Sequence, residues 1–302
     1  MSRDYPKSGP VTLRTNLAES PLSHALRAGE IKSDLVTFDF CGPKVANQGF
    51  KPMLRDRAFD AGELAIGTFL QAKVYGKPLS LLPAVVMGRP QHQYLLYNSK
   101  LGTLSPRDIE GRRVGTRIYT QTTGIWVRGI LQHEYGVDLS RVTWLCSDDP
   151  HLAEYRDPPE IKRLPSGSKP IEDMLLDGDL EMALLGKEMP DEPRVRPLIA
   201  DPLSASNEWC RKYDTVPINH FFVVDHALAQ TRPDVVREIY RMLAESKRLA
   251  GLPKGDIDFH PFGIAETRKA LSMFIRYCVE QKIIPRSIEA DDLFGDVARA
   301  LS

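Results

Sequence analysis

The stretch AGELAIGTFLQAKVYGKPLSLLPAVVM (residues 61–87) decides the fold class. Residues 61–66 have the composition of a strand, and residues 67–75 have the apolar spacing of a helix. Residues 79–87 form an apolar run typical of a buried strand, interrupted by Pro83. This strand–helix–strand order favours an α/β fold in which helices cover a sheet.

The same alternation extends along the chain on both sides of this stretch. Short apolar runs predict strands at residues 11–14, 35–40 and 93–97. Together with residues 61–87, this order predicts a largely parallel sheet with helices on both faces.

A second unit begins near Ser105. Residues 122–135 have apolar positions at helical spacing, and Gly136 is well placed to end that helix. Further elements are expected in this unit as a helical turn at 106–109, strands at 111–115, 142–146 and 180–185, an extended loop at 151–170 and a helix at 171–176.

The last third contains one strand (215–224) and three predicted helices (232–250, 265–281 and 291–301). We therefore expect a two-lobed α/β protein with a ligand cleft between the lobes. Lobe 1 comprises residues 1–101 and 201–302, and lobe 2 is inserted at residues 102–200. The two crossings are expected near residues 98–104 and 198–218.

Composition and charge restrict the partners. The chain has 302 residues, with 40 basic and 40 acidic side chains. A balanced charge without a basic block indicates no nucleic acid and no membrane surface as partner. The first ten residues, MSRDYPKSGP, contain no apolar segment of a secretory signal, which predicts a cytoplasmic protein. The four scattered cysteines are expected to be reduced.

Residues 104–136, LSPRDIEGRRVGTRIYTQTTGIWVRGILQHEYG, contain a long motif. They match the pattern P-D-L-x-G-K-R-V-G, a Tyr, and T-A-x-x-W-x-R-G-x-L-x-x-E-Y-G-V; a later P-I-M-H pattern matches PINH at 217–220. With Glu63, Arg89 and His92 upstream, the chain resembles the 4,5-dihydroxyphthalate decarboxylase family. The resemblance implies a fold like type II periplasmic binding proteins and a carboxy-lyase acting on a small hydroxylated aromatic acid.

The chain departs from the family pattern at three places expected to line the cleft. Arg117 stands where the family has an acidic residue, and Thr123 replaces a small Ala. HPFG at 260–263 stands where the family has W-P-Y-G. These departures bear on the identity of the substrate.

The chemistry of such a decarboxylation selects the candidate residues. The protein must anchor anionic groups, polarise a phenol and move a proton, which suits arginine forks and histidines. The candidate catalytic residues are His92, His220 and Glu63. The candidate substrate-binding residues are Arg89, Arg117, Tyr119, Thr122, Thr123, Trp126 and Arg128. We expect no metal and no cofactor, since no ligand spacing is diagnostic.

Several candidates have a structural alternative. Arg128 could instead pair with Glu134 or Asp138, and Trp126 could be a core residue. The remaining histidines expected at the surface are His24, His133, His151 and His226. Trp209 and Tyr213, in a polar helix, suggest an interface of a homo-oligomer.

Two other function classes stay open. One is a solute-binding protein that captures a small aromatic or dicarboxylic anion. The other is a different cytoplasmic enzyme with the same fold, for example one resembling chorismate dehydratase. The long motif around Trp126 favours the decarboxylase family, whose partner is a small aromatic acid.

Overall fold

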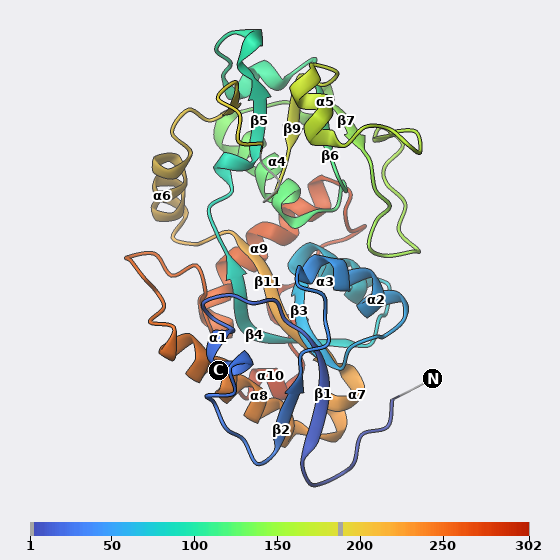
Figure 1. Ribbon diagram of the computed structural model, residues 1–302, viewed down its shortest axis with the longest axis vertical. Coiled ribbons are helices and arrows are strands. Elements are labelled where there is room, and N and C mark those ends of the chain that lie inside the picture. Colours follow the sequence, from blue (N-terminus) through green and yellow to red (C-terminus); the bar gives the residue numbers. More distant parts are fainter. Residues whose placement is uncertain (1–2, 187–189, 302) are drawn as a thin grey trace.

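Two separate sheets organise the chain in the computed structural model, which describes residues 3–186 and 190–301 (Figure 1). The first sheet has the strand order β2-β1-β3-β11-β4, and the second has the order β10-β5-β9-β6-β7-β8. The predicted two-lobed α/β architecture is thus confirmed. The strands of the first sheet are β1 (Val11–Asn16), β2 (Val36–Asp39), β3 (Ala61–Ala65), β4 (Leu79–Gly88) and β11 (Ile218–Asp225). Those of the second are β5 (Leu95–Asn98), β6 (Arg113–Thr116), β7 (Thr143–Cys146), β8 (Lys162–Arg163), β9 (Met182–Leu184) and β10 (Val195–Pro197).

Both sheets are mixed rather than largely parallel. In the first sheet β1 runs parallel to β2 and β3, but β11 is antiparallel to both β3 and β4. In the second sheet β6 is parallel to β7 and β9, whereas β5 is antiparallel to β9 and β10. The prediction of a largely parallel sheet is therefore wrong for β11, β4 and β5. A strand buried on both faces has the same apolar composition in either direction, so its direction cannot be predicted from that pattern.

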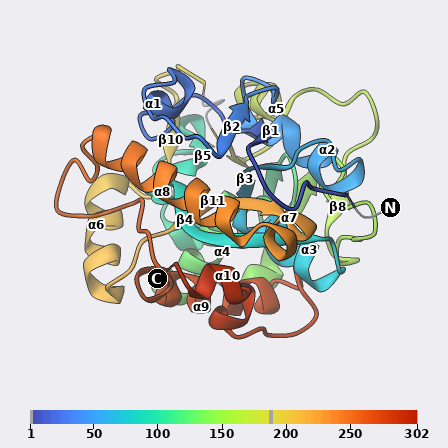
Figure 2. The same cartoon turned by 90° about the horizontal axis from the view of Figure 1, so that it is seen from below.

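The helices cover both faces of the first sheet. Side chains of β11 alternate: Phe221 and Val223 pack with one hydrophobic cluster, and Phe222 and Val224 pack with the other. Seen from below, α8 lies on one side of β4 and β11, and α9 lies on the other (Figure 2). The α-helices are α1 (His24–Arg27), α2 (Phe50–Arg55), α3 (Ile66–Val74), α4 (Thr122–Tyr135), α5 (Ile171–Asp177), α6 (Pro202–Tyr213), α7 (His226–Thr231), α8 (Pro233–Leu249), α9 (Ile264–Glu280) and α10 (Asp296–Arg299).

The chain crosses between the lobes earlier than predicted. It leaves the first sheet with β4 and joins the second with β5, so the first crossing lies at residues 89–94. The predicted boundary at residue 101 therefore falls one strand too late. The return crossing, between β10 and β11, includes α6 and lies within the range expected from the sequence.

Two predicted helices show how a glycine determines where a helix ends. The helix expected at residues 122–135 is confirmed, and Gly136 ends it in the left-handed conformation (φ 66°) with its N–H bonded to the Leu131 carbonyl. The helix expected at 291–301 is wrong. Gly295 is extended (φ −79°, ψ 172°) and separates a 3₁₀ turn at Ala290–Leu293 from α10.

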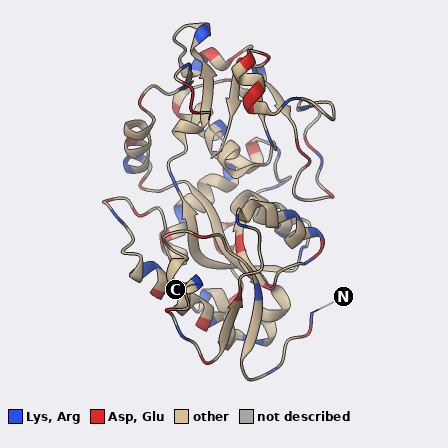
Figure 3. Cartoon of the chain, in the orientation of Figure 1, with Lys and Arg blue, Asp and Glu red and all other residues tan. Residues whose placement is uncertain are grey.

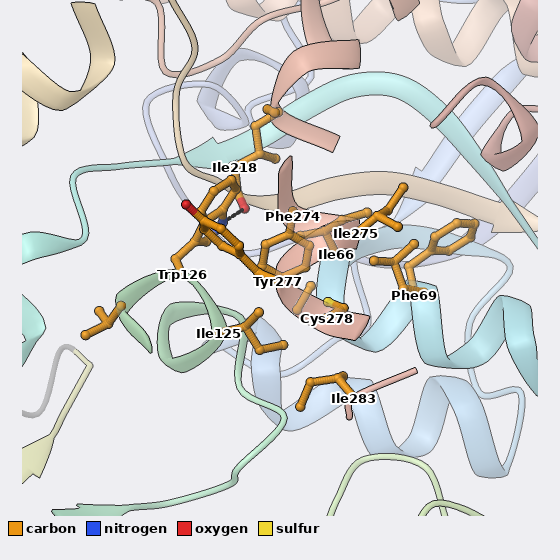
Figure 4. Close-up of a cluster of buried hydrophobic side chains, with 14 of the residues drawn as sticks. Ile66, Phe69, Ile125, Trp126, Ile218, Phe274, Ile275, Tyr277, Cys278 and Ile283 are labelled. Atoms are coloured by element: carbon orange, nitrogen blue, oxygen red, sulfur yellow. Dashed lines mark hydrogen bonds between the residues drawn. The ribbon is translucent and has the colours of Figure 1, made fainter. Parts of the chain in front are cut away.

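A hydrophobic cluster joins the lobes (Figure 4). Trp126 of α4 is fully buried in it, donates its indole N–H to the Ile218 carbonyl at 2.8 Å, and lies 4.9 Å from the Phe274 ring centroid. Trp209 also packs on Trp126, at 6.0 Å between ring centroids. The Trp209 ring is buried inside the chain and so does not offer the interface surface expected there, whereas Tyr213 is only partly buried and the homo-oligomer stays a prediction.

Basic and acidic residues are interspersed along the chain in both lobes (Figure 3). Among the residues that the structure describes, no helix is both long and apolar enough to span a bilayer.

A first prediction concerns the packing of α4 on α9. A Cβ built on Gly129 would lie 2.1 Å from Cδ2 of the buried Tyr277 ring. Gly129→Ala should therefore lower the free energy of unfolding by ~1–3 kcal/mol, the usual cost of overpacking. Gly255→Ala, with no neighbour within 4 Å, is the control and should stay within ~0.5 kcal/mol. Urea unfolding measures both. A Gly129→Ala protein as stable as the wild type, as helix propensity alone would allow, would contradict this packing.

A second prediction concerns His92, which is buried with no hydrogen-bond partner at either ring nitrogen among the described residues. Burial lowers its pKa to about 4 from an ordinary value of 6.5. Between these values the unfolded chain binds more protons than the folded one, so stability falls as pH falls from 6.5 to 4. His92→Leu should reduce that slope by up to ~1.4 kcal/mol per pH unit. His24→Gln, at an exposed position, should not. Equal slopes in wild type and His92→Leu would refute the burial effect.

Candidate functional site

A pocket of about 170 Å³ lies between the lobes. Lobe 1 contributes the ends of β3, β4 and β11, the start of α2 and the segment 44–47. Lobe 2 contributes the start of α4, Arg117, His151 and Gly186. Six of the residues predicted from the sequence line this pocket: Glu63, Arg89, Arg117, Thr122, Thr123 and His220.

Glu63 and His220 form a buried pair at the pocket wall. The antiparallel register places Glu63 on β3 opposite Phe222, two residues along β11 from His220, so both side chains project from the same face of the sheet. His220 Nδ1 lies 2.6 Å from Glu63 Oε2, and Glu63 Oε1 accepts the Ala18 N–H at 2.7 Å. A carboxylate only accepts, so Nδ1 is the donor, and in the neutral form of the imidazole Nε2 carries the lone pair.

Arg89 lies at the end of β4 within a polar network that crosses between the lobes. Its Nη2 donates to Thr123 Oγ1 at 3.3 Å, and its guanidinium lies 4.2 Å above the Tyr94 ring. Asn219 Nδ2 also donates to Thr123 Oγ1, at 3.3 Å, and Gln91 Nε2 donates to Asn219 Oδ1 at 2.7 Å. The network therefore fixes the position of the planar fork beside the pocket.

The N-termini of α3 and α4 meet at the pocket. The Gly67 N–H donates to Thr122 Oγ1 at 3.1 Å, and a Cβ on Gly67 would lie 3.2 Å from that oxygen. Glycine therefore allows the two helices to approach this closely. The first N–H groups of a helix have no intrahelical acceptor and bear partial positive charge. Two such termini together favour an anion in the pocket.

The charged side chains that line the described part of the pocket include more cations than anions. Lys44, Arg89 and Arg117 are cationic, and Glu19 and Glu63 are acidic. Glu19 also pairs with Arg27 outside the pocket, at 2.9 Å. Within residues 3–186 and 190–301, Arg117 has only a loose ion pair with Asp148, at 3.8 Å. The positive charge that remains suits an acidic ligand.

A second histidine, His151, also lines the pocket. The prediction that His151 lies at the surface is wrong, since only 5% of it is exposed. Burial, with the nearby cations Arg117 and Lys51, lowers its pKa to about 3, so it is neutral at pH 7. It comes from the loop predicted at 151–170, whose composition contains no sign of burial. Its position depends on contacts with the other lobe, which a sequence pattern does not include.

The Phe50 ring contacts both histidines of the pocket. Its ring centroid lies 5.2 Å from that of His220 and 5.5 Å from that of His151, with edge-on geometry in both cases. The sequence analysis did not select Phe50, Asn219 or Gln91. Asn219 adjoins His220 in the matched PINH motif, which was the one available signal for it.

Four predicted site residues do not line this pocket. His92 lies under Trp209, with ring centroids 6.4 Å apart, and Trp126 belongs to the core described above. Arg128 is fully buried and donates to Gln281 Oε1 and to the Tyr119 carbonyl, each at 2.7 Å. The Tyr119 ring stacks on the Arg128 guanidinium at 4.1 Å. Arg128 thus pairs with Gln281 and the Tyr119 carbonyl rather than with Glu134 or Asp138, and it supports the loop that precedes α4.

The titratable side chains do not gather as a metal site: within residues 3–186 and 190–301, no three His, Cys, Asp or Glu side chains lie close enough together to hold an ion.

Curated proteins with similar sequences have one name in common. The chain is 24% identical over 281 residues to the 4,5-dihydroxyphthalate decarboxylase of Comamonas testosteroni, covering 80% of this chain and 83% of that protein. It is 25% identical over 171 residues to the 4,5-dihydroxyphthalate decarboxylase of Pseudomonas putida, covering 52% and 65%. No protein-family model matches the chain.

Solved structures with the same architecture include binding proteins and an enzyme. The aliphatic sulphonate binding protein SsuA of Escherichia coli superposes with a TM-score of 0.61 at 9% identity, covering 95% of this chain and 92% of that one. The alkanesulfonate-binding protein SsuA of Xanthomonas axonopodis pv. citri has a TM-score of 0.56 at 16% identity, covering 95% and 99%. The desulfurization enzyme DSZB has a TM-score of 0.57 at 12% identity, covering 96% and 98%.

The identities of 9–16% to these solved structures show a shared fold alone. The sequence similarity to the Comamonas testosteroni decarboxylase, by contrast, extends over 80% of the chain. The chain therefore resembles the 4,5-dihydroxyphthalate decarboxylases and has the two-lobed fold of the periplasmic binding proteins.

Proposed function

We propose that this protein is a decarboxylase of a small hydroxylated aromatic acid similar to 4,5-dihydroxyphthalate. The observation that supports it most is the Glu63–His220 pair, with 2.6 Å between Oε2 and Nδ1, set in the wall of a cationic pocket. A simple anion receptor needs cations and N–H donors, but it has no need of a histidine oriented by a buried carboxylate. The names of the two similar curated proteins agree with this choice.

The pocket matches one aromatic ring in size and lining. Its volume of about 170 Å³ is close to the ~150 Å³ of a cavity that holds benzene. Phe50, Val45, Ala46 and Met87 supply apolar surface for the ring. Polar side chains from both lobes line the same space, as expected for a site that orients a small polar ligand.

The carboxylates of the substrate are assigned to the cationic side. Arg89 and Arg117 offer planar forks that suit carboxylate oxygens. The N-termini of α3 and α4 add backbone donors beside them. Cations that hold a carboxylate do not themselves favour the loss of CO₂, so the driving interaction must act at the hydroxyl.

The proton transfer is assigned to His220. Its Nε2 accepts the proton of a substrate hydroxyl ortho or para to the departing carboxylate, so that an O–H bond breaks and an N–H bond forms. The oxygen then delocalises charge to the ring carbon, which takes a proton from solvent; the C–C bond breaks, CO₂ leaves, and the ring becomes aromatic again. His220 returns its proton to the oxygen, and the net reaction consumes one proton. His92, the other candidate for this role, does not line the pocket.

Glu63 is a positioning residue in this scheme. It holds the His220 tautomer and stabilises the imidazolium that forms after proton transfer, as the aspartate of a catalytic triad does.

A binding protein without turnover is the second candidate, since two of the similar folds are those of sulfonate-binding proteins. The distinction is experimental: a receptor binds the acid and releases it unchanged.

The pair predicts two separable effects on turnover. His220→Gln should lower kcat for CO₂ release ~10²–10⁴-fold with little change in substrate affinity. Glu63→Gln would donate an amide N–H to Nδ1, move the imidazole proton to Nε2, and lower kcat to a similar extent. His226→Gln, at the exposed start of α7, is the control and should keep wild-type turnover. If both pair variants turn over like the wild type, the assignment of His220 is wrong.

The anion site predicts a different signature. Arg89→Met removes one charged donor and should weaken binding of the dicarboxylate ~10–100-fold, the range for hydrogen bonds to charged groups. Calorimetry with the His220→Gln background measures affinity without turnover. Arg237→Met, at an exposed position of α8, is the matched control. An unchanged dissociation constant in Arg89→Met would place the carboxylate elsewhere.

A further inference from the structure

His151 enters the pocket from lobe 2 but is held by lobe 1. Its Nδ1 lies 2.8 Å from Thr68 Oγ1 in the first turn of α3, and both residues are buried. Its position in sequence, between β7 and β8, assigns it to the other lobe. The site therefore includes a second histidine whose orientation is set across the cleft.

The backbone around His151 is also fastened to lobe 1. Arg55 Nε donates to the His151 carbonyl at 3.0 Å, and its Nη2 donates to the Pro150 carbonyl at 2.8 Å. Lys77 Nζ lies 2.5 Å from Glu154 Oε1 in the same segment. These contacts hold the backbone on both sides of His151 against lobe 1 and so position its imidazole.

The hydrogen bond with Thr68 determines what His151 offers the ligand. The imidazole is neutral, since burial and the cations Arg117, Lys51 and Arg55 and the neighbouring His220 all lower its pKa. A neutral imidazole whose Nδ1 accepts from the Thr68 hydroxyl carries its ring proton on Nε2. His151 then donates a hydrogen bond, whereas His220 accepts one.

The two imidazoles lie against the same ring, Phe50, at nearly equal distances. One acceptor and one donor that line the same small pocket suit two adjacent hydroxyls on a bound aromatic ring: one hydroxyl loses its proton and the other oxygen receives an N–H. A charge that develops on such a pair of oxygens is stabilised by a neutral donor that is already in place.

We propose that Thr68 donates to His151 Nδ1 and that His151 in turn donates a hydrogen bond from Nε2 to one hydroxyl oxygen of the bound acid, while His220 takes the proton of the adjacent hydroxyl. The proposal rests on the proposed function for the role of His220. Thr68 and Arg55 are positioning residues, and His151 is a residue that contacts the substrate.

Two probes separate the hydroxyls from the carboxylates: 4,5-dihydroxyphthalate, and phthalate, which has the same carboxylates and no hydroxyl. Calorimetry measures the affinity of each for the wild type and for variants of the full chain. His151→Leu should weaken the dihydroxy acid ~10–100-fold, the range for hydrogen bonds to charged groups, and change phthalate affinity less than ~3-fold. His24→Gln, an exposed histidine, is the control and should change neither.

Thr68 provides the test that does not depend on deleting the histidine. Thr68→Val keeps the shape but removes the hydroxyl, and it should lower the preference for the dihydroxy acid over phthalate. Thr68→Ser restores the hydroxyl and should restore the preference. A merely structural role would shift the unfolding temperature without changing this ratio of affinities.

Equal loss of both acids in His151→Leu, or an unchanged preference in both His151→Leu and Thr68→Val, would overturn the proposal. So would a wild type that binds neither acid at millimolar concentration. Binding with the expected preference but without CO₂ release would support the role of His151 and refute the decarboxylase assignment.

Discussion

The hydrogen bond from the Gly67 N–H to Thr122 Oγ1 joins the first turns of α3 and α4, and the pocket depends on this contact. It brings together one helix N-terminus from each lobe, and a Cβ at position 67 would lie 3.0 Å from Ile125 Cδ1 and 3.2 Å from Thr122 Oγ1, so glycine relieves a tight contact. On one side of the contact lies the core around Trp126, and on the other lies the pocket. The lobes are therefore packed together where the ligand site begins.

The polar groups of the pocket are costly to bury without partners, and most of them are paired by residues from the other lobe or another strand. Glu63 satisfies His220 and is itself satisfied by the Ala18 backbone. Thr68 satisfies His151, and Thr123 accepts from Arg89 and Asn219. In both histidines the pairing engages Nδ1, and the proposed scheme assigns Nε2 to the ligand. The same residues that make burial tolerable thus define one acceptor and one donor.

Much of the fold could be predicted from local patterns. The helix at 122–135 ends at Gly136 as its spacing indicated, and residues 61–87 form the expected strand, helix and strand. The predictions that were wrong concerned which strands pair with one another and in which direction. β5 joins the second sheet because it pairs with β9 and β10, and the direction of β11 depends on its neighbours β3 and β4. The helix predicted at residues 291–301 is wrong because the extended Gly295 interrupts it.

The sequence predicted those site residues that lie in or next to a strand, or at the start of a helix, and that belong to a recognisable motif. Glu63, Arg89, Thr122 and His220 are of this kind, and they meet in one pocket. His151 lies in an irregular loop, and only contacts with Arg55 and Thr68 place it. Arg128 shows the converse: it belongs to the motif, but its helix position points it into the core toward Gln281.

The most direct test of the account follows the reacting carbon itself. The protein is incubated with 4,5-dihydroxyphthalate in D₂O, and the ring protons are followed by NMR. The account predicts loss of one carboxylate as CO₂ and a 3,4-dihydroxybenzoate with deuterium at the carbon that lost it, formed by the wild type and far more slowly by His220→Gln. Substrate that is bound yet unchanged after prolonged incubation would contradict it.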